Sequence, residues 1–462
     1  MKKNRFVWLG LLSLVLVVGS CQPVTPTPAL FSSRTPSPVP ATSTPAPTDK
    51  PKLEVDMNAL KGKKVKILYP WDVDQNRVNQ MIEDFNLINI WGIQAVGEAY
   101  KSDELLAEAM RQGDLDANII IGRTYDLLDP QNQVGLLELN LYINDPTWGV
   151  MDSYQPDSPF AALAPNANDA APRYSLPLAY DAGLIYYRTG WAKELGFEAA
   201  PTSWDEFVSQ MQAGLRANLA DDVYVNNGTG GLLLSKSVMS AQSWYAAFGG
   251  DYLMQNKVVQ MQDSALDASF RALKQAFVDD TSWVGLEPTP NQYFTDRFAL
   301  AYEGLLSEIS QQENYLPAKD TELNWETIPY PTADGGGSIA LESIGAAINS
   351  TDAGTDMAAW FCVRWLLQPA QQQNLVELHG LWPATGHPAK VAPRYAALHP
   401  AWASALRDGV HLTLAPEDAA WSVNRYVLQD AYMRVYGLEP EYFSSIISVL
   451  NQTLAENPAG NP

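Results

Sequence analysis

The chain has 462 residues, of which 46% are hydrophobic and 10% aromatic, and its formal net charge is −22. A composition this apolar is typical of a globular protein and excludes a largely disordered chain. The strong negative charge argues against nucleic acid, and against an anionic membrane, as the binding partner.

The first 20 residues have the parts of a signal peptide. Residues 1–5 carry three positive charges, residues 6–18 are almost entirely apolar, and small residues follow at 19 and 20. The apolar stretch is too short for a membrane-spanning helix. Val18-Gly19-Ser20-Cys21 resembles a bacterial lipobox, which predicts cleavage before Cys21 and a lipid on its sulfur. The alternative is an ordinary secretory signal with a chance cysteine.

Residues 21–52 form a predicted linker rich in proline, threonine and serine. Such a segment cannot bury a core and is expected to be an extended, semi-rigid spacer. With a lipid at one end, it would hold the following domain just off a membrane surface.

The remainder is too long for one hydrophobic core of usual size, so two lobes are expected. Once Cys21 is assigned to the lipid, Cys362 is the only other cysteine of the chain. Because it lies in an apolar helical pattern, we expect a buried free thiol and no disulfide.

The first elements after the linker follow an α/β pattern. Residues 64–69 predict a strand that residues 70–72 leave in a loop, and residues 76–85 have apolar side chains at helical spacing. A helix capped by Ser102 and a short buried strand at 118–122 come next. This order predicts an α/β lobe with a largely parallel sheet.

Later elements are predicted from the same signals. They are a strand at 184–187, a helix capped by Thr202 or Ser203, a helix capped by Ser264, strands at 298–302 and 346–348, and a helix over 355–367. Alternation along a strand places Tyr186 and Tyr187 on opposite faces, which predicts one core and one surface tyrosine.

Sequence patterns for catalysis and metal binding are absent. The chain has no GxSxG, HExxH, CxxC or GxxxxGK[ST] motif, and its four histidines lack ligand spacing on one helix. No cofactor and no metal are therefore expected.

Residues 174–188, YSLPLAYDAGLIYYR, and residues 201–207, PTSWDEF, carry a family resemblance. They resemble the signature of family 1 extracellular solute-binding proteins, the maltose-binding-protein-like receptors of ABC importers. Later landmarks at 248–251, 299–304 and 371–384 occur in the same order, and the resemblance extends over about residues 64 to 390.

The resemblance implies an α/β fold of the two-lobed periplasmic-binding-protein type (type II, family 1), in which hinge strands join the lobes and a ligand is trapped in the cleft between them. It divides the chain into lobe 1, at 53–179 plus 329–378, and lobe 2, at 180–328 plus 379–462. Residues 180–183 would lie on the first crossing, with Gly183 supplying backbone freedom. The alternative is a polar turn that merely precedes a strand.

A carbohydrate cleft needs carboxylates or amides for hydroxyl groups and aromatic rings for C–H faces, placed on loops at the carboxyl ends of strands. The candidate ligand-binding residues are Trp71, Asp72, Tyr125, Tyr180, Asp181, Trp244, Glu303, Glu342 and Trp382. For each aromatic residue, burial in the core is the alternative. Trp204, in the first turn of a capped helix, is predicted to be a packing residue.

The resemblance implies a monomeric, non-enzymatic lipoprotein outside the cytoplasm that captures a small-molecule solute and delivers it to the transmembrane subunits of an ABC transporter. The first loop, residues 71–74, has no lysine, and Tyr180 stands where a carboxylate is often found, so maltodextrin itself is not implied. A neutral polyol or oligosaccharide is favoured, and a cationic ligand or a peptide stays open. Two other functions stay open: a surface glycan hydrolase with Glu303 and Glu342 as paired carboxylates, and a ligand-sensing receptor.

Overall fold

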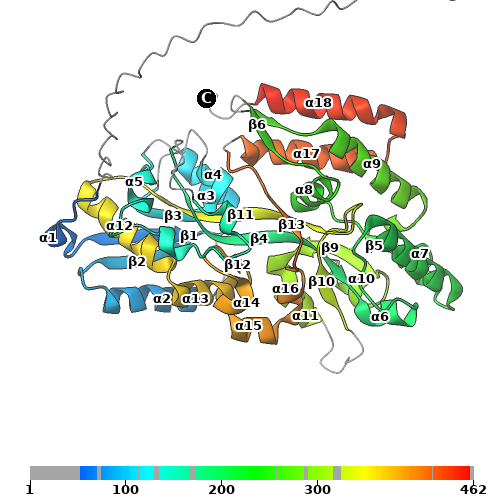
Figure 1. Cartoon of the computed structure of the whole chain (residues 1–462), viewed down its shortest axis with the longest axis horizontal. Helices are drawn as coiled ribbons and strands as arrows, with labels where there is room; N and C mark the ends of the chain where they lie inside the picture. The colour runs from blue at the N-terminus through cyan, green and yellow to red at the C-terminus, as the bar shows by residue number, and fades with distance from the viewer. Residues whose placement is uncertain are drawn as a thin grey trace, which may run out of the picture. The chain divides into compact units, whose positions relative to one another are not determined.

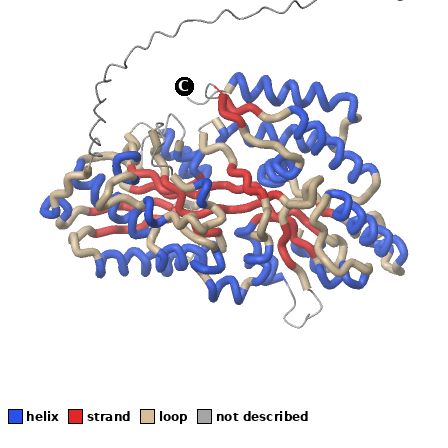
Figure 2. The backbone as a smooth tube through the Cα atoms, in the orientation of Figure 1, coloured by secondary structure: helices blue, strands red, loops and turns tan. Residues whose placement is uncertain are grey.

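The computed structural model describes residues 52–69, 74–112, 115–128, 135–165, 172–255, 258–285, 290–315, 324–418 and 420–457. In this part of the chain, helices lie on both sides of a large mixed sheet (Figures 1 and 2). None of the described helices is both long and apolar enough to span a bilayer. The predicted residues Cys21, Trp71 and Asp72 lie outside the described residues.

One half of the sheet begins with three parallel strands in the order β2-β1-β3. Their bounds are β1 (Lys64–Tyr69), β2 (Gln94–Ala99) and β3 (Ile119–Arg123). The apolar sides of α2 (Gln75–Ile88) and α12 (Ala353–Leu366) pack on one face, and α3 (Asp103–Arg111) packs on the other. The predicted strand-helix-helix-strand order of this half is confirmed, except that β2 was missed because its polar and small residues lack a strand pattern.

Strand β4 (Leu176–Tyr187) belongs to both halves of the sheet. Its first half pairs with β11 (Ser338–Ile348) and β12 (Trp382–Pro383). Its second half pairs with β9 (Ala301–Leu305) and β10 (Glu326–Ile328). Residues 180 and 181 therefore lie inside a continuous strand, and the alternative of a polar turn before a strand is wrong.

Strand β11 is the second strand that runs through both halves. Its start pairs in parallel with β13 (His411–Leu414), and its later residues pair antiparallel with β4 and β3. All residues of β4 and β11 are buried. The prediction of one surface tyrosine is therefore wrong: Tyr186 and Tyr187 are both fully buried, because β4 is covered on both faces.

The other half of the sheet continues from β9 to β5 (Leu232–Leu233) and β8 (Ser282–Trp283), and a separate hairpin pairs β6 (Leu253–Gln255) with β7 (Val258–Gln260). Its long helices are α7 (Trp204–Ala220), α8 (Val238–Ala247), α9 (Asp263–Val278), α17 (Trp421–Val435) and α18 (Phe443–Glu456). The shorter helices of the described residues include α1 (Met57–Leu60), α4 (Thr124–Leu127), α5 (Asn140–Ile143), α6 (Thr189–Glu194), α10 (Asn291–Thr295), α11 (Ile309–Tyr315), α13 (Pro369–His379), α14 (Pro388–Val391), α15 (Pro393–Leu398) and α16 (Pro400–Ser404).

The predicted helix caps are partly correct. Ser102 caps α3, and Ser203 caps α7 in a capping box with Glu206. Ser264 is not a cap, because α9 begins one residue earlier and Gln262 precedes it without a side-chain cap. The packing role of Trp204 is confirmed by its ring contacts with Phe207, Trp244 and Phe248.

Two strands have bounds that differ from the predicted ones, and two candidate residues therefore lie inside strands and not in loops. Strand β9 starts at Ala301, so Glu303 lies inside it and not after it. Strand β11 starts at Ser338, well before the predicted strand at 346–348, so Glu342 also lies inside a strand. In both cases polar neighbours bind the carboxylate, which allows the strand to continue through an acidic residue.

Gly183 has a different role from the predicted one. Its φ is not positive, and a Cβ atom there would lie 2.1 Å from Ser243 Oγ and 2.8 Å from Met239 Cγ, both on α8. The missing side chain therefore lets α8 approach β4 closely, and backbone freedom is not needed.

We predict that Gly183→Ala lowers the free energy of unfolding by about 1–3 kcal/mol, because the added methyl group overpacks the contact between β4 and α8. Urea denaturation measures the change. The control is Gly336→Ala, where the nearest atom is 3.6 Å from the added carbon, so a change below about 0.5 kcal/mol is expected. Equal stability of the two variants would contradict this role of Gly183.

Candidate functional site

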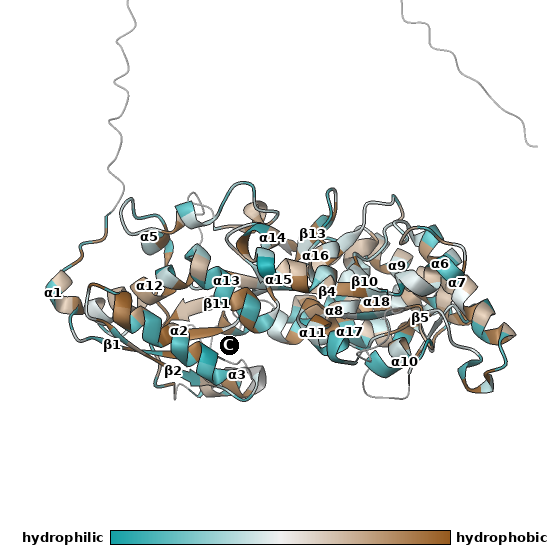
Figure 3. Cartoon of the chain, turned by 90° about the horizontal axis from the view of Figure 1, so that it is seen from below, coloured by the Kyte–Doolittle hydropathy of each residue, from teal (hydrophilic) through white to brown (hydrophobic). Residues whose placement is uncertain are grey.

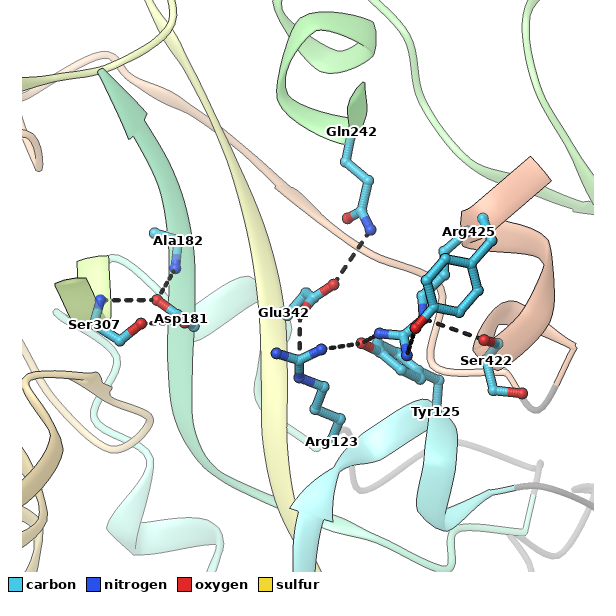
Figure 4. A network of polar contacts seen from close by, with 10 residues as sticks. Arg123, Tyr125, Asp181, Ala182, Gln242, Ser307, Glu342, Ser422 and Arg425 are labelled. Atoms are coloured by element: carbon cyan, nitrogen blue, oxygen red, sulfur yellow. Dashed lines mark hydrogen bonds and ion pairs between the residues drawn. The ribbon is translucent and has the colours of Figure 1, made fainter. Parts of the chain in front are cut away.

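A buried polar network lies where β3 ends beside β11 (Figure 4). Glu342, in β11, is 4% exposed, and its Oε2 lies 3.6 Å from Nε of Arg123 at the end of β3. Arg123 also donates a hydrogen bond of 3.3 Å to the hydroxyl of Tyr125 in α4. The ion pair neutralises a carboxylate that would otherwise be costly to bury.

Helix α17 adds a second arginine to this network. The Arg425 guanidinium donates to the Tyr125 hydroxyl and lies 4.5 Å from the centre of the Tyr125 ring and 4.7 Å from that of Tyr426. It also donates to the Tyr426 hydroxyl at 3.1 Å and to the Ser422 carbonyl at 3.2 Å. Hydrogen bonds and cation–π contacts together make burial of this charge tolerable. Residues 300 positions apart in the sequence, Tyr125 and Arg425, are thus in direct contact.

Asp181 lies opposite Glu342 in the pairing of β4 with β11. Its carboxylate accepts hydrogen bonds from the backbone N–H of Ala182 at 2.8 Å and from the backbone N–H and hydroxyl of Ser307 at 3.2 and 2.8 Å. Burial raises the pKa of Asp181, and these donors and the Arg123 charge partly offset that rise.

Two buried polar groups, one in the network and one on the opposite face of β4, have no hydrogen-bond partner among the described residues. Gln242 of α8 donates to Glu342 at 3.3 Å, but its own carbonyl oxygen, Oε1, has no partner. The hydroxyl of Tyr180 is also buried and without a partner. Since buried polar groups are nearly always hydrogen-bonded, these atoms are candidates for contacts with a ligand or water.

The candidate residues fall into three groups in the structure. Tyr125, Asp181 and Glu342 belong to the network just described. Tyr180 pairs with Trp382 through the backbones of β4 and β12, and Trp382 is fully buried, with its indole N–H directed at the Trp402 carbonyl at 3.3 Å. The third group is Glu303 with Trp244.

Glu303, in β9, has a buried carboxylate that lies beside the first turns of α8. Its oxygens accept hydrogen bonds from the backbone N–H of Ser235 at 2.7 Å, from the Ser240 hydroxyl and from the indole N–H of Trp244. Burial raises the pKa of Glu303 to about 7, although all three donors favour the ionised form. The same Trp244 ring packs edge-on against Tyr330 and Trp204.

Arg123, Gln242 and Arg425 were not among the predicted residues. Arg123 is the polar residue that ends the apolar strand β3, and its position at the carboxyl end of a strand could have marked it as a candidate. Gln242 and Arg425 lie on helices, and no pattern in the sequence indicates which neighbours those helices contact. The described residues contain no group of three histidine, cysteine, aspartate or glutamate side chains that could hold a metal ion.

The Tyr125 hydroxyl can be tested by its removal. Tyr125→Phe removes an acceptor that the guanidinium groups of Arg123 and Arg425 share, and we predict a loss of about 1–3 kcal/mol in unfolding free energy. In the control, Tyr426→Phe, the ring is 47% exposed, so water can replace the lost acceptor and the loss should be smaller. If urea denaturation shows equal losses, Tyr125 is not the important acceptor.

The raised pKa of Glu303 predicts a pH-dependent contribution to stability. The folded chain keeps the Glu303 proton up to about pH 7, whereas the ordinary value for glutamate is 4.5. The stability of the wild type relative to Glu303→Gln should therefore fall as the pH rises from 4.5 to 7 and be constant above that range, with a total change of at least about 1 kcal/mol. Denaturation of both proteins over this range is the measurement, and a constant difference would contradict the raised pKa.

Comparison with known proteins gives the family. A model of the bacterial extracellular solute-binding protein family matches residues 80–397. A probable ABC transporter-binding protein of Deinococcus radiodurans is 32% identical over 95 residues, which are 20% of this chain and 22% of that protein. The match thus spans less than a quarter of that relative.

Solved structures with a similar fold cover most of the chain. The sugar-binding protein MalE of Xanthomonas citri has a TM-score of 0.69 at 16% identity, over 85% of this chain and 98% of its own. A cyclic alpha-maltosyl-1,6-maltose binding protein of Arthrobacter globiformis has a TM-score of 0.67 at 16% identity, over 85% and 99%. An ABC transporter solute-binding protein of Thermotoga lettingae, bound with α-D-tagatose, has 0.63 at 17% identity, over 86% and 99%.

At these identities the structural matches show the fold alone, which is the mixed α/β, two-lobed fold of MalE-like binding proteins. The family model covers more than half of the 462 residues. The chain therefore belongs to the bacterial extracellular solute-binding proteins.

Proposed function

We propose that the chain is a lipid-anchored receptor that captures a sugar or oligosaccharide outside the cytoplasm and delivers it to the transmembrane subunits of an ABC transporter. The observation that carries this proposal is a buried polar network in which β3 and α8 bind Glu342 through Arg123 and Gln242, and α4 and α17 join through the Tyr125 hydroxyl. The family and the fold agree with this function.

The chemistry of the network suits a neutral polyhydroxyl ligand. Sugar hydroxyls both donate and accept hydrogen bonds, and the two carboxylates Asp181 and Glu342 are strong acceptors. The free carbonyl of Gln242 adds a further acceptor. Because Arg123 already balances the charge of Glu342, no ionic group is required of the ligand.

The names of the structural neighbours support a sugar. One is described as a cyclic alpha-maltosyl-1,6-maltose binding protein, one as a sugar-binding protein, and one is bound with α-D-tagatose. The Deinococcus relative, a probable ABC transporter-binding protein, supports delivery to a transporter.

We also propose that the lobes follow the predicted division, 53–179 plus 329–378 and 180–328 plus 379–462. The boundary at 179/180 falls inside β4, and the boundary at 328/329 falls between β10 and β11. Bending of β4 and β11 would then close the lobes around the ligand, and the transporter would recognise the closed form. The receptor would act as a monomer.

The proposed receptor is not an enzyme. A glycan hydrolase of the kind considered above needs Glu303 and Glu342 as a working pair. Three donors hold Glu303 next to α8, while Glu342 is bound by Arg123 and Gln242, so the two carboxylates belong to separate groups. A sensory receptor of the same fold would bind its ligand in the same way and differ only in its partner.

Asp181 tests the ligand-binding site. We predict that Asp181→Asn weakens sugar binding by more than about 1 kcal/mol, through loss of a charge-assisted hydrogen bond. Titration calorimetry with the sugar that most raises the melting temperature is the measurement. Asp334→Asn, in an exposed turn, is the control and should bind as the wild type does. Unaltered affinity of Asp181→Asn would remove this residue from the site, and hydrolysis of the sugar would favour the enzyme.

Cys21 tests the anchor. Cys21→Ala should move the protein from the membrane fraction to the soluble fraction, because no lipid can be attached. Cys362→Ala is the matched control, since Cys362 is a buried free thiol in α12, and it should stay with the membrane. Continued membrane association of Cys21→Ala would overturn the anchor.

A further inference from the structure

The end of the molecule where β1 and β2 begin exposes an unusual group of side chains. We call it the basal surface and define it by Met57 of α1, Lys61, Lys64, and Leu87, Ile88 and Ile90 at the end of α2. The aliphatic members are highly exposed: Leu87 is 81%, Ile88 62% and Ile90 85% exposed. Figures 1 and 3 both show α1, α2, β1 and β2 together at this end.

Hydrogen bonds hold the two loops of the basal surface against each other. The N–H of Gly62 donates to the carbonyl of Gly92 at 2.9 Å, and the N–H of Gln94 donates to the carbonyl of Lys63 at 2.8 Å. A Cβ atom at Gly92 would lie 3.6 Å from Cγ of Lys61. The lysines before β1 and the apolar residues after α2 therefore form one continuous surface.

This surface is basic in a chain that is strongly acidic overall. Residues 52–66 contain five lysines and two acids, and residues 85–97 contain no charged residue, whereas the whole chain has a net charge of −22. Lys63 and Lys66 are paired with acids. Lys61 and Lys64, the two lysines of the basal surface, are exposed and have no ion pair with any described residue.

We propose that the basal surface docks on an anionic lipid bilayer. Exposed aliphatic side chains beside unpaired lysines fit the boundary between acyl chains and anionic headgroups, because the aliphatic groups can enter the bilayer while the lysines contact phosphate. Glu83 and Asp84, one turn earlier in α2, mark the border of the surface.

The position of the tether favours a bilayer over another partner. The described chain starts at Lys52, just before α1, and 30 residues separate Lys52 from Cys21. A linker of this length reaches roughly 30 to 90 Å, depending on how extended it is. The proposal rests on the lipid anchor of the proposed function, which would keep this end of the domain close to the membrane and make even weak docking effective.

The net charge of −22 does not prevent such docking. Salt screens charges beyond about 8 Å at physiological ionic strength, so a bilayer is influenced mainly by the charges on the surface that faces it. The acidic remainder of the chain is repelled when it approaches, and docking should therefore fix one orientation of the receptor.

A second exposed apolar group provides a matched control. Val223, Tyr224 and Val225, after α7, are 48%, 86% and 77% exposed, but Asp221 and Asp222 precede them. Figures 1 and 3 show α7 at the end of the molecule opposite to α1. Apolar exposure alone would attract both groups to a membrane, whereas the proposal selects only the basal surface.

The test is hydrogen–deuterium exchange on the chain from Cys21 onward, coupled through the Cys21 thiol to maleimide lipids. Coupling is selective because Cys362 is 1% exposed. Vesicles of phosphatidylcholine are compared with vesicles that also contain phosphatidylglycerol. Chemical coupling supplies the tether, so the result does not depend on whether cells attach a lipid to Cys21.

On phosphatidylglycerol vesicles, we expect slower exchange at residues 57–64 and 85–92 and no change at 219–225. The variant Lys61→Glu/Lys64→Glu should lose this protection. Its untethered binding to the same vesicles should fall at least about tenfold, because two lysine contacts with anionic headgroups are lost. The control variant Tyr224→Ser should keep both the protection from exchange and the vesicle binding. Unchanged melting temperatures would show that the variants fold. Equal exchange on the two vesicle types, or protection at 219–225, would overturn the proposal.

Discussion

The burial of Glu342 in the middle of β11 is the constraint on which the candidate site depends. A carboxylate inside a strand that is covered on both faces needs partners, and Arg123 and Gln242 supply them from β3 and α8. Arg123 shares the Tyr125 hydroxyl with Arg425 of α17. Glu342 thus binds groups from β3 and α8 directly, and the Tyr125 hydroxyl links α17 to them although Tyr125 and Arg425 are 300 positions apart in the sequence.

This arrangement connects stability with the proposed function. The strands β4 and β11 run through both halves of the sheet, and their polar residues Asp181 and Glu342 lie opposite each other at the crossing. Groups that hold the two halves together are then the same groups that a ligand would contact. A ligand that replaced or added hydrogen bonds here would change the free energy of any bending at the crossing, which is what a closing receptor requires.

Local signals in the sequence predicted most of the fold and part of the candidate site. Apolar spacing located α2, and capping serines located α3 and α7. The family resemblance around residues 174–207 implied the two-lobed fold, and family and structure comparisons confirm it. Alternation failed for the pair Tyr186 and Tyr187, because β4 is covered on both faces and both rings are buried. The role of Gly183 depends on where α8 packs, and Arg425 enters the site only because α17 returns to α4. Such long-range contacts leave no mark in a local pattern.

In the proposed mechanism, the two halves joined by β4 and β11 close around a sugar. The most direct measurement is the distance between spin labels at Glu83→Cys on α2 and Asp205→Cys on α7, both exposed positions, in a chain that begins after Cys21. Pulsed electron paramagnetic resonance would be recorded without ligand and with the sugar that most raises the melting temperature. The distance should shorten when the sugar is bound, because the two halves then approach each other. An unchanged distance at saturating sugar would contradict this mechanism.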